Sequence, residues 1–142
     1  MIKKILFIPI IYFYFINISF SNTVIECKNF IGSQVIDNKG KITNLDDGYS
    51  GQIIRIYLDK DEKVEPSVEW QGPFNNFKVK IQEGFISKRE GWVNYLHYHP
   101  DVFRLYTFFW KKSQMSLVET EAQLGTGVPK VKTLIGNCSI SK

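Results

Sequence analysis

The most informative part of the 142-residue sequence is WVNYLHYHPDVFRLYTFFW, residues 92–110. Two runs rich in aromatic and β-branched residues, 92–98 and 102–110, flank Pro100-Asp101, a dipeptide typical of turns. The second run has apolar residues on both faces, which predicts a central strand or a strand whose outer face is buried. This part of the chain therefore predicts neighbouring strands of a β-sheet.

Strand patterns extend from this stretch in both directions. In 77–81, Phe, Val and Ile alternate with two lysines, which predicts that Phe77, Val79 and Ile81 face the core. Residues 52–58 have the same two-residue period. Turns rich in Gly, Asn and Asp separate short strands at intervals of about 8–12 residues. We therefore expect residues 22–142 to form a single all-β domain, an antiparallel meander closed into a small barrel or packed as a sandwich.

Three segments are harder to interpret. After the strand expected at 23–30, Gly32-Ser33 predicts a break. Pro66 lies in phase with the apolar residues of 63–70 and has no N–H group, which predicts an edge or bulged strand there. Residues 113–125 fit either a helix or the return strand of a hairpin, and the short loop that precedes them favours the hairpin.

The N-terminus has the three parts of a secretory signal. Lys3 and Lys4 are followed by a nearly continuous apolar run, 5–18, and then by Ser19-Phe20-Ser21, which places small residues around a cleavage site. We expect residues 1–21 to be a signal helix that is removed on export. The alternative is a retained membrane anchor, which would be the only membrane attachment. Both the charge pattern and the length of the run favour a periplasmic or secreted protein.

Cys27 and Cys138 are the only cysteines, and they lie near the two ends of the predicted domain. An even number of cysteines in an exported protein favours a disulfide. The bridge requires the first and last strands to lie side by side, with Cα atoms within about 7 Å. The alternative is two free buried thiols.

Charge and motifs exclude several classes of function. Without Lys3 and Lys4 the formal net charge falls from +4 to +2, which is too balanced to indicate a nucleic-acid partner. The chain has no Gly-x-Ser-x-Gly sequence and no glycine-rich phosphate loop. We therefore expect neither an enzyme nor a bound cofactor.

The two histidines of the chain, His97 and His99, are followed by Asp101. On a strand the histidines share one face, and two imidazoles with a carboxylate could hold zinc or copper. The alternative is a strand end with polar residues entering a turn, which we favour. A metal-dependent hydrolase at His97 and His99 is accordingly the third functional hypothesis.

Aromatic residues are concentrated in 92–110, and Trp92, Tyr95, Phe103 and Trp110 are the candidates for contact with a ligand. They could surround a cavity for an apolar molecule, or they could simply pack in the core. The first functional hypothesis is thus an exported binding module for a small apolar ligand or an envelope protein.

The second hypothesis is an inhibitor or interaction protein of an extracellular hydrolase. The expected architecture is similar to that of small exported β-barrel proteins that inhibit lysozymes, which often have a disulfide that closes the barrel. Ser50-Gly51 matches only a fragment of their inhibitory loop motifs, so the resemblance assigns no functional residue here.

Overall fold

The computed structural model describes residues 23–59, 64–122 and 129–142. They form ten strands: β1 (Thr23–Asn38), β2 (Lys41–Tyr49), β3 (Ile53–Leu58), β4 (Ser67–Gln71), β5 (Phe77–Lys80), β6 (Gln82–Ser87), β7 (Trp92–His99), β8 (Val102–Phe109), β9 (Gln114–Ala122) and β10 (Pro129–Ser141). None of the described residues is helical, so these segments hold no helix of the length and hydropathy needed to cross a membrane. The all-β prediction is confirmed. The signal predicted for 1–21 lies outside the described residues.

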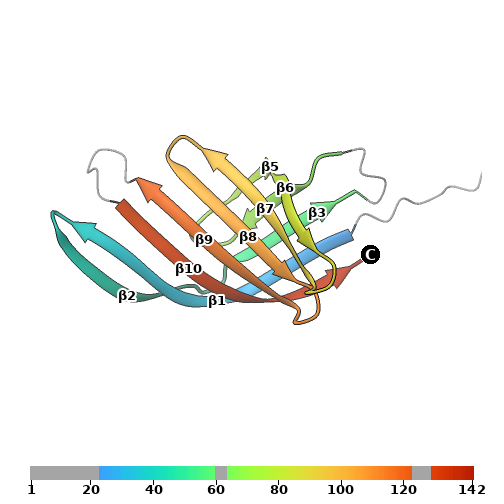
Figure 1. The fold of residues 1–142 in the computed structure, drawn as a ribbon, viewed down its shortest axis with the longest axis horizontal. Coiled ribbons are helices and arrows are strands. Elements are labelled where there is room, and N and C mark those ends of the chain that lie inside the picture. Colours follow the sequence, from blue (N-terminus) through green and yellow to red (C-terminus); the bar gives the residue numbers. More distant parts are fainter. Residues whose placement is uncertain (1–22, 60–63, 123–128) are drawn as a thin grey trace, which may run out of the picture.

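The strands form one antiparallel sheet in the order β5-β4-β3-β1-β10-β9-β8-β7-β6, and β2 pairs with β1 beside this path (Figure 1). The long strand β1 has two partners along one edge. Its beginning, 23–27, pairs with β3, and its end, 30–38, pairs with β2. A bulge at Asn29, whose φ is 57°, marks the change of partner. Asparagine tolerates this left-handed conformation better than most residues, so the strand can bend there.

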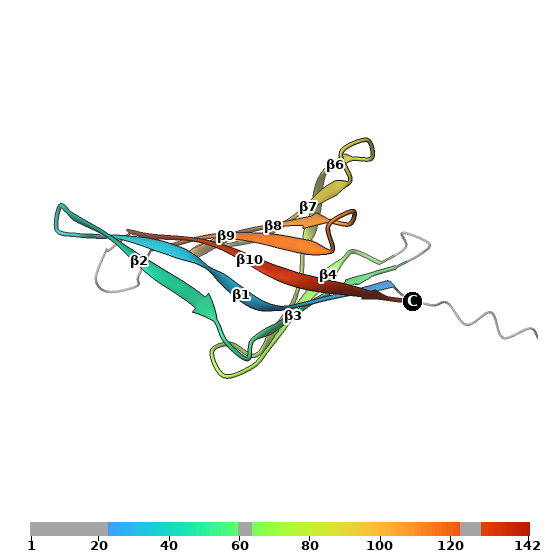
Figure 2. The ribbon, with the colours of Figure 1, turned by 90° about the horizontal axis from the view of Figure 1, so that it is seen from below.

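The chain itself joins the two edges of the sheet. The edge strands β5 and β6 are separated only by Ile81; β5 pairs with β4, whereas β6 pairs with β7. The N–H group of Ile81 donates a hydrogen bond to the carbonyl of Pro66, with an N–O distance of 2.8 Å. The sheet is therefore a nearly closed barrel. Figure 2 shows that the β1–β2 hairpin and the neighbouring ends of β9 and β10 extend beyond it.

The core of the barrel is formed by residues that alternate along its strands. Its fully buried members, by size, include Trp70, Tyr95, Tyr106, Phe30, Ile25, Ile54, Ile56, Met115, Leu117 and Leu134. Burial of one such aliphatic or aromatic side chain contributes about 1.5–3 kcal/mol. Gly136 allows the ring of Phe30 to lie against β10, because a Cβ atom at this position would be 2.6 Å from Phe30 Cε1.

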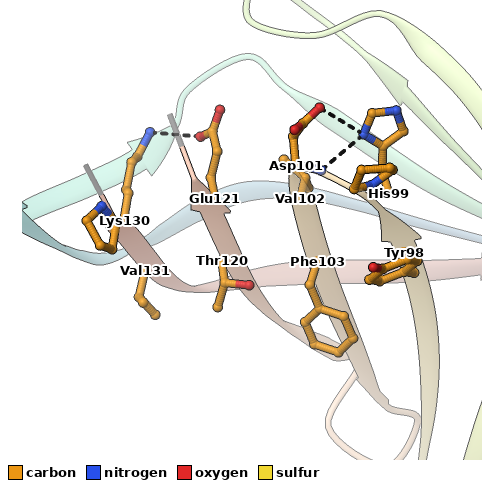
Figure 3. Close-up of a pocket in the computed structure, with 11 residues that line it drawn as sticks. Tyr98, His99, Asp101, Val102, Phe103, Thr120, Glu121, Lys130 and Val131 are labelled. Atoms are coloured by element: carbon orange, nitrogen blue, oxygen red, sulfur yellow. Dashed lines mark hydrogen bonds and ion pairs between the residues drawn. The ribbon is translucent and has the colours of Figure 1, made fainter. Parts of the chain in front are cut away.

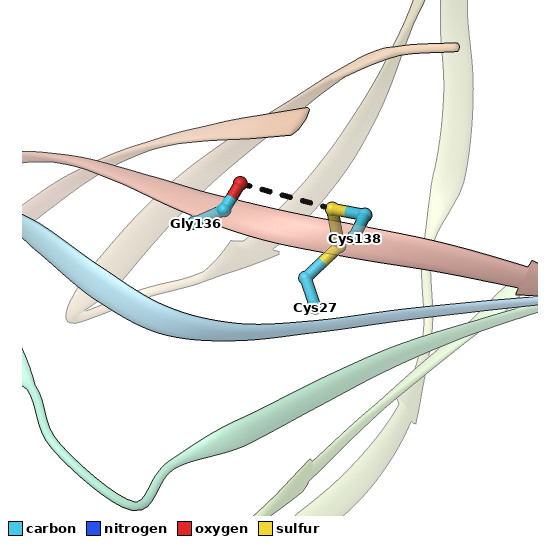
Figure 4. The surroundings of a disulfide bond; sticks show 3 residues. All are labelled: Cys27, Gly136 and Cys138. Carbon is cyan, nitrogen blue, oxygen red and sulfur yellow. Dashed lines mark hydrogen bonds between the residues drawn. A yellow bond between two sulfur atoms is a disulfide. The ribbon is translucent and has the colours of Figure 1, made fainter. Parts of the chain in front are cut away.

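A disulfide joins the first strand to the last. Cys27 and Cys138 are directly opposite each other in the pairing of β1 with β10, and their Cα atoms are 4.0 Å apart (Figure 4). The bridge spans 111 positions of the sequence, and Cys27 is fully buried. The predicted cross-link and the predicted adjacency of the two ends of the domain are confirmed.

Local predictions had mixed outcomes. The hairpin alternative for 113–125 is confirmed as far as Ala122, because β9 pairs with β8. The break predicted at Gly32-Ser33 is wrong, since β1 continues through it to Asn38. The edge or bulged strand predicted around Pro66 is also wrong. The strand begins at Ser67, one residue after the proline, and lies between β3 and β5.

Candidate functional site

The four aromatic residues predicted to contact a ligand lie on two faces of the barrel. Tyr95 faces the core, and it lines one hollow together with Trp110. Trp92 and Phe103 lie on the outside, where Trp92 Nε1 donates a hydrogen bond to Glu90 Oε2 at 2.6 Å. The structure thus brings together two of the four candidates.

The hollow that Tyr95 and Trp110 share lies at the end of the barrel where the first and last described residues meet. We call it the mouth hollow. Its volume is about 260 Å³, and its lining comes from β1, β3, β6, β7, β8 and β10. The lining residues are Thr23, Ile25, Leu58, Glu83, Ile86, Val93, Tyr95, Phe108, Trp110 and Ile140. Apolar side chains predominate, and Glu83 is the one carboxylate among them.

Large buried side chains lie behind the mouth hollow. Tyr95 and Tyr106 are almost completely buried, and Trp70 Nε1 donates a hydrogen bond to the Tyr106 hydroxyl at 3.0 Å. Burial raises the pKa of the Tyr95 hydroxyl, and the negative charge of Glu83 raises it further. The hydroxyl of Tyr95, which lines the hollow, is therefore neutral at physiological pH.

A second feature of the interior is a line of polar residues across four neighbouring strands. His97, Arg104, Glu119 and Lys132 lie directly opposite one another on β7, β8, β9 and β10. Together with Asp47 of β2 we call them the charge row. Because residues opposite each other in an antiparallel pair point to the same side, the row follows from the strand register.

Short contacts connect the charge row. Arg104 Nε lies 2.5 Å from Glu119 Oε2, and Lys132 Nζ lies 2.8 Å from Asp47 Oδ2. Tyr49 links the two ion pairs, since its hydroxyl donates to Glu119 Oε1 at 3.2 Å and accepts from Lys132 Nζ at 3.1 Å. Two cations and two anions therefore balance, as buried charges require.

Aromatic rings cover the charge row from the opposite wall. The guanidinium of Arg104 lies 5.0 Å from the ring centroid of Trp70 and 5.3 Å from that of Phe77. His97 Nδ1 is 3.5 Å from Arg104 Nη1, and burial, followed by the charge of Arg104, lowers the pKa of His97. The histidine is thus neutral at pH 7. The row joins neighbouring strands of the barrel through ion pairs and hydrogen bonds.

The predicted metal candidates have different surroundings. His97 is buried beside a guanidinium, whereas His99 is exposed, and its Nδ1 is 3.6 Å from Asp101 Oδ2. Within the described ranges, no group of three or more His, Cys, Asp or Glu side chains is placed to share a metal ion. This arrangement gives no support to a hydrolase centred on the two histidines.

His99 and Asp101 line a second hollow, of about 310 Å³, at the tip of the β7–β8 hairpin. Figure 3 shows them on the same side of the sheet as Glu121 and Lys130, whose carboxylate and ammonium groups are 3.5 Å apart. Tyr98, Phe103, Thr120 and Val131 point to the other side (Figure 3). Because this lining divides between two faces of the sheet, the mouth hollow is the better candidate site.

The charge row could have been found in the sequence. Glu119 continues the two-residue period of Met115 and Leu117, and Lys132 has the same relation to Leu134. A charged residue in phase with the apolar face of a strand predicts a buried ion pair. In contrast, the mouth hollow combines residues from strands far apart in the sequence.

Comparisons of the chain with family models, with curated proteins and with solved structures gave no match. The geometry of the described residues is therefore the basis for assigning a function.

Proposed function

We propose that the protein is a small exported binding module that holds an apolar ligand in the mouth hollow. The observation that carries this proposal is the lining of the hollow, in which Tyr95 and Trp110 lie among aliphatic side chains. Pockets of this kind, mostly apolar with few polar groups, are typical of small-molecule sites. The proposal assigns binding, and not catalysis, to the protein.

A periplasmic or secreted location is part of the proposal. The disulfide between Cys27 and Cys138 supports it, because such bonds persist in oxidising compartments. The leader predicted for 1–21 supports it independently.

The size and charge of the mouth hollow limit the class of ligand. A volume of about 260 Å³ suits a molecule of one or two rings or a short acyl chain. Glu83 at the lining disfavours an anionic ligand, since two negative charges would lie close together. We therefore propose a neutral or cationic apolar molecule.

The test uses prodan, a neutral fluorescent dye built on one two-ring naphthalene, titrated into the exported protein. Ile86→Trp fills the hollow from its exposed side and is the critical variant. Ile42→Trp is the matched control, because Ile42 lies on β2, outside the hollow, and is exposed. We expect wild type and Ile42→Trp to bind the dye alike, and Ile86→Trp to bind at least about tenfold more weakly, a loss of about 1.4 kcal/mol.

Two results would count against the proposal. One is a wild-type protein that leaves the dye emission unchanged. The other is an equal affinity in Ile86→Trp and Ile42→Trp, which would place the dye elsewhere on the barrel.

A further inference from the structure

Five neighbouring strand segments present no charged side chain on the outer surface of the barrel; the nearest outward charges are Lys28, opposite Asn137, and Asp46, opposite Ser33. We define the outer face as the residues that point away from the core in five neighbouring segments. In each segment these are alternate residues, starting with the first and ending with the last. The segments are 92–98 in β7, 103–109 in β8, 114–120 in β9, 131–137 in β10 and 31–35 in β1. None of these outward positions is Asp, Glu, Lys, Arg or His. The five segments are neighbours in the sheet, so the uncharged surface is continuous.

The charges of β8, β9 and β10 point inward, whereas Glu26 and Lys28, in the first part of β1, point outward. Arg104, Glu119 and Lys132 all lie in the charge row, on the core side of β8, β9 and β10. On the opposite wall of the barrel, charged side chains lie on the outer surface, as is usual for a protein surface. There Arg55 of β3 pairs on the outer surface with Glu26 at 2.8 Å and with Glu69 at 3.5 Å. The two sides of the barrel are therefore built for different surroundings.

Large apolar side chains are exposed on the outer face. Ile31 is 72% exposed, and it lies opposite Ile135 in the register of β1 with β10. Val35 lies opposite Val131 in the same way, and both valines are exposed. A continuous exposed patch of this kind indicates an interaction site. It also gives a reason for the sequence of β8, which is apolar on both faces although its outer face is not covered by the described residues.

The exposed pairs have a symmetric arrangement. The polar pair Ser33–Thr133 lies midway between the pairs Ile31–Ile135 and Val35–Val131. Consider a two-fold axis that is parallel to the sheet, runs across the strands and passes over Ser33–Thr133. This axis would place the Ile31–Ile135 pair of one copy over the Val35–Val131 pair of the other. Two-fold interfaces require such a self-complementary surface.

We propose that the outer face binds the outer face of a second copy of this chain, in a two-fold dimer whose sheets pack face to face. The five segments are uncharged, so like charges of the two copies meet only at the border of the contact, where the axis brings Asp46 of β2, opposite Ser33, toward its symmetry mate. Four segments of seven residues and one of five, in strands about 4.8 Å apart with about 3.3 Å per residue, have a flat footprint of about 520 Å². The accessible area buried on each copy is larger than this footprint, because the side chains protrude from the sheet. It approaches the roughly 800 Å² per partner of a specific interface.

A protein surface fits the outer face better than a lipid surface does. Asn94, Thr107 and Ser116 lie opposite one another across β7, β8 and β9, where a bilayer would remove water from their polar groups. In a dimer these side chains can form hydrogen bonds with the second copy. The face ends at β2, where the charged residue Asp46 lies opposite Ser33.

The test compares two lysine substitutions by sedimentation equilibrium of the exported protein over a range of concentrations. Ile31→Lys places one charge per copy within the proposed interface, two residues from the two-fold axis. Ile42→Lys is the matched control, since Ile42 is 73% exposed, on the neighbouring strand β2 and outside the outer face. We expect wild type and Ile42→Lys to dimerise with the same Kd, and Ile31→Lys to dimerise at least about tenfold more weakly.

A cross-link provides a second readout that does not depend on the lysine variant being folded. Thr133 is exposed and lies at the proposed axis, so Thr133→Cys should form a covalent dimer under mild oxidation, whereas Asn44→Cys on β2 should not. A wild-type monomer at every concentration would overturn the proposal, as would a dimer with equal Kd in both lysine variants. A monomer that binds neutral phosphatidylcholine vesicles, and loses this binding in Ile31→Lys, would overturn it in favour of a membrane surface.

Discussion

Replacing Glu119 with glutamine removes one negative charge from the charge row and keeps the shape of the side chain. Glu119 is 3% exposed, and its two oxygens contact Arg104 and the Tyr49 hydroxyl. In the variant, Arg104 and Lys132 remain buried with Asp47 as the one remaining carboxylate of the row. Since a buried cation without its partner is costly, the folded state loses stability relative to the unfolded chain.

The expected loss is about 3–5 kcal/mol in the free energy of unfolding, the range for a buried ion pair with one partner removed. Domains of this size have a total stability of about 5–15 kcal/mol, so the change is a large part of the whole. The assay is guanidinium unfolding with the disulfide intact, followed by the fluorescence of Trp70, which is buried beside Arg104.

Glu121→Gln is the matched control, two residues further along the same face of β9. Its side chain is 35% exposed, and Lys130 Nζ is 3.5 Å away. Partial exposure to water limits the loss here to about 1 kcal/mol or less. A Glu119→Gln variant that is no less stable than Glu121→Gln would refute the view that the ion pairs of the charge row stabilise the barrel.

Three further predictions concern stability. Burial, then Arg104 and His99, lower the pKa of His97, so the unfolded chain binds a proton near pH 6.5 that the folded chain does not. The free energy of unfolding should therefore decrease as the pH falls below about 6.5, and His97→Gln should show a smaller decrease in unfolding measured from pH 7 to pH 5. Reduction of the disulfide should lower the free energy of unfolding by up to about 4.7 kcal/mol in thermal or denaturant unfolding, because the bridge closes a loop of more than 100 residues. Gly136→Ala should cost about 1–3 kcal/mol through contact with Phe30, and adding Phe30→Leu should recover part of this loss; equal stability of Gly136→Ala and wild type would contradict the contact.

Much of the fold was accessible from local patterns. The alternation in 77–81 correctly predicted that Phe77, Val79 and Ile81 face the core, because side chains of a strand alternate between two environments. The pairing of Cys27 with Cys138 was also predicted, since the two cysteines of a chain expected to be exported have one intramolecular partner each.

The incorrect local predictions have a common cause. Gly32-Ser33 resembles a turn in isolation, but β10 and β2 pair with β1 on both sides there and keep it extended. The backbone of Thr133 approaches Gly32 so closely that a Cβ atom would lie 2.0 Å from the carbonyl oxygen. This glycine therefore serves a close approach between strands instead of a turn.

An all-β domain with joined ends could be predicted from periodicity, turn composition and the two cysteines. Periodicity and turns depend on residues that are near in sequence, and the chain has only one possible pair of cysteines. Strand order and register required the folded molecule, since they depend on pairings between distant segments such as β1 with β10. The same pairings assemble the mouth hollow from distant strands. Local periodicity indicates that Glu119 and Lys132 face the core, but only the pairing of strands shows which charges they meet there.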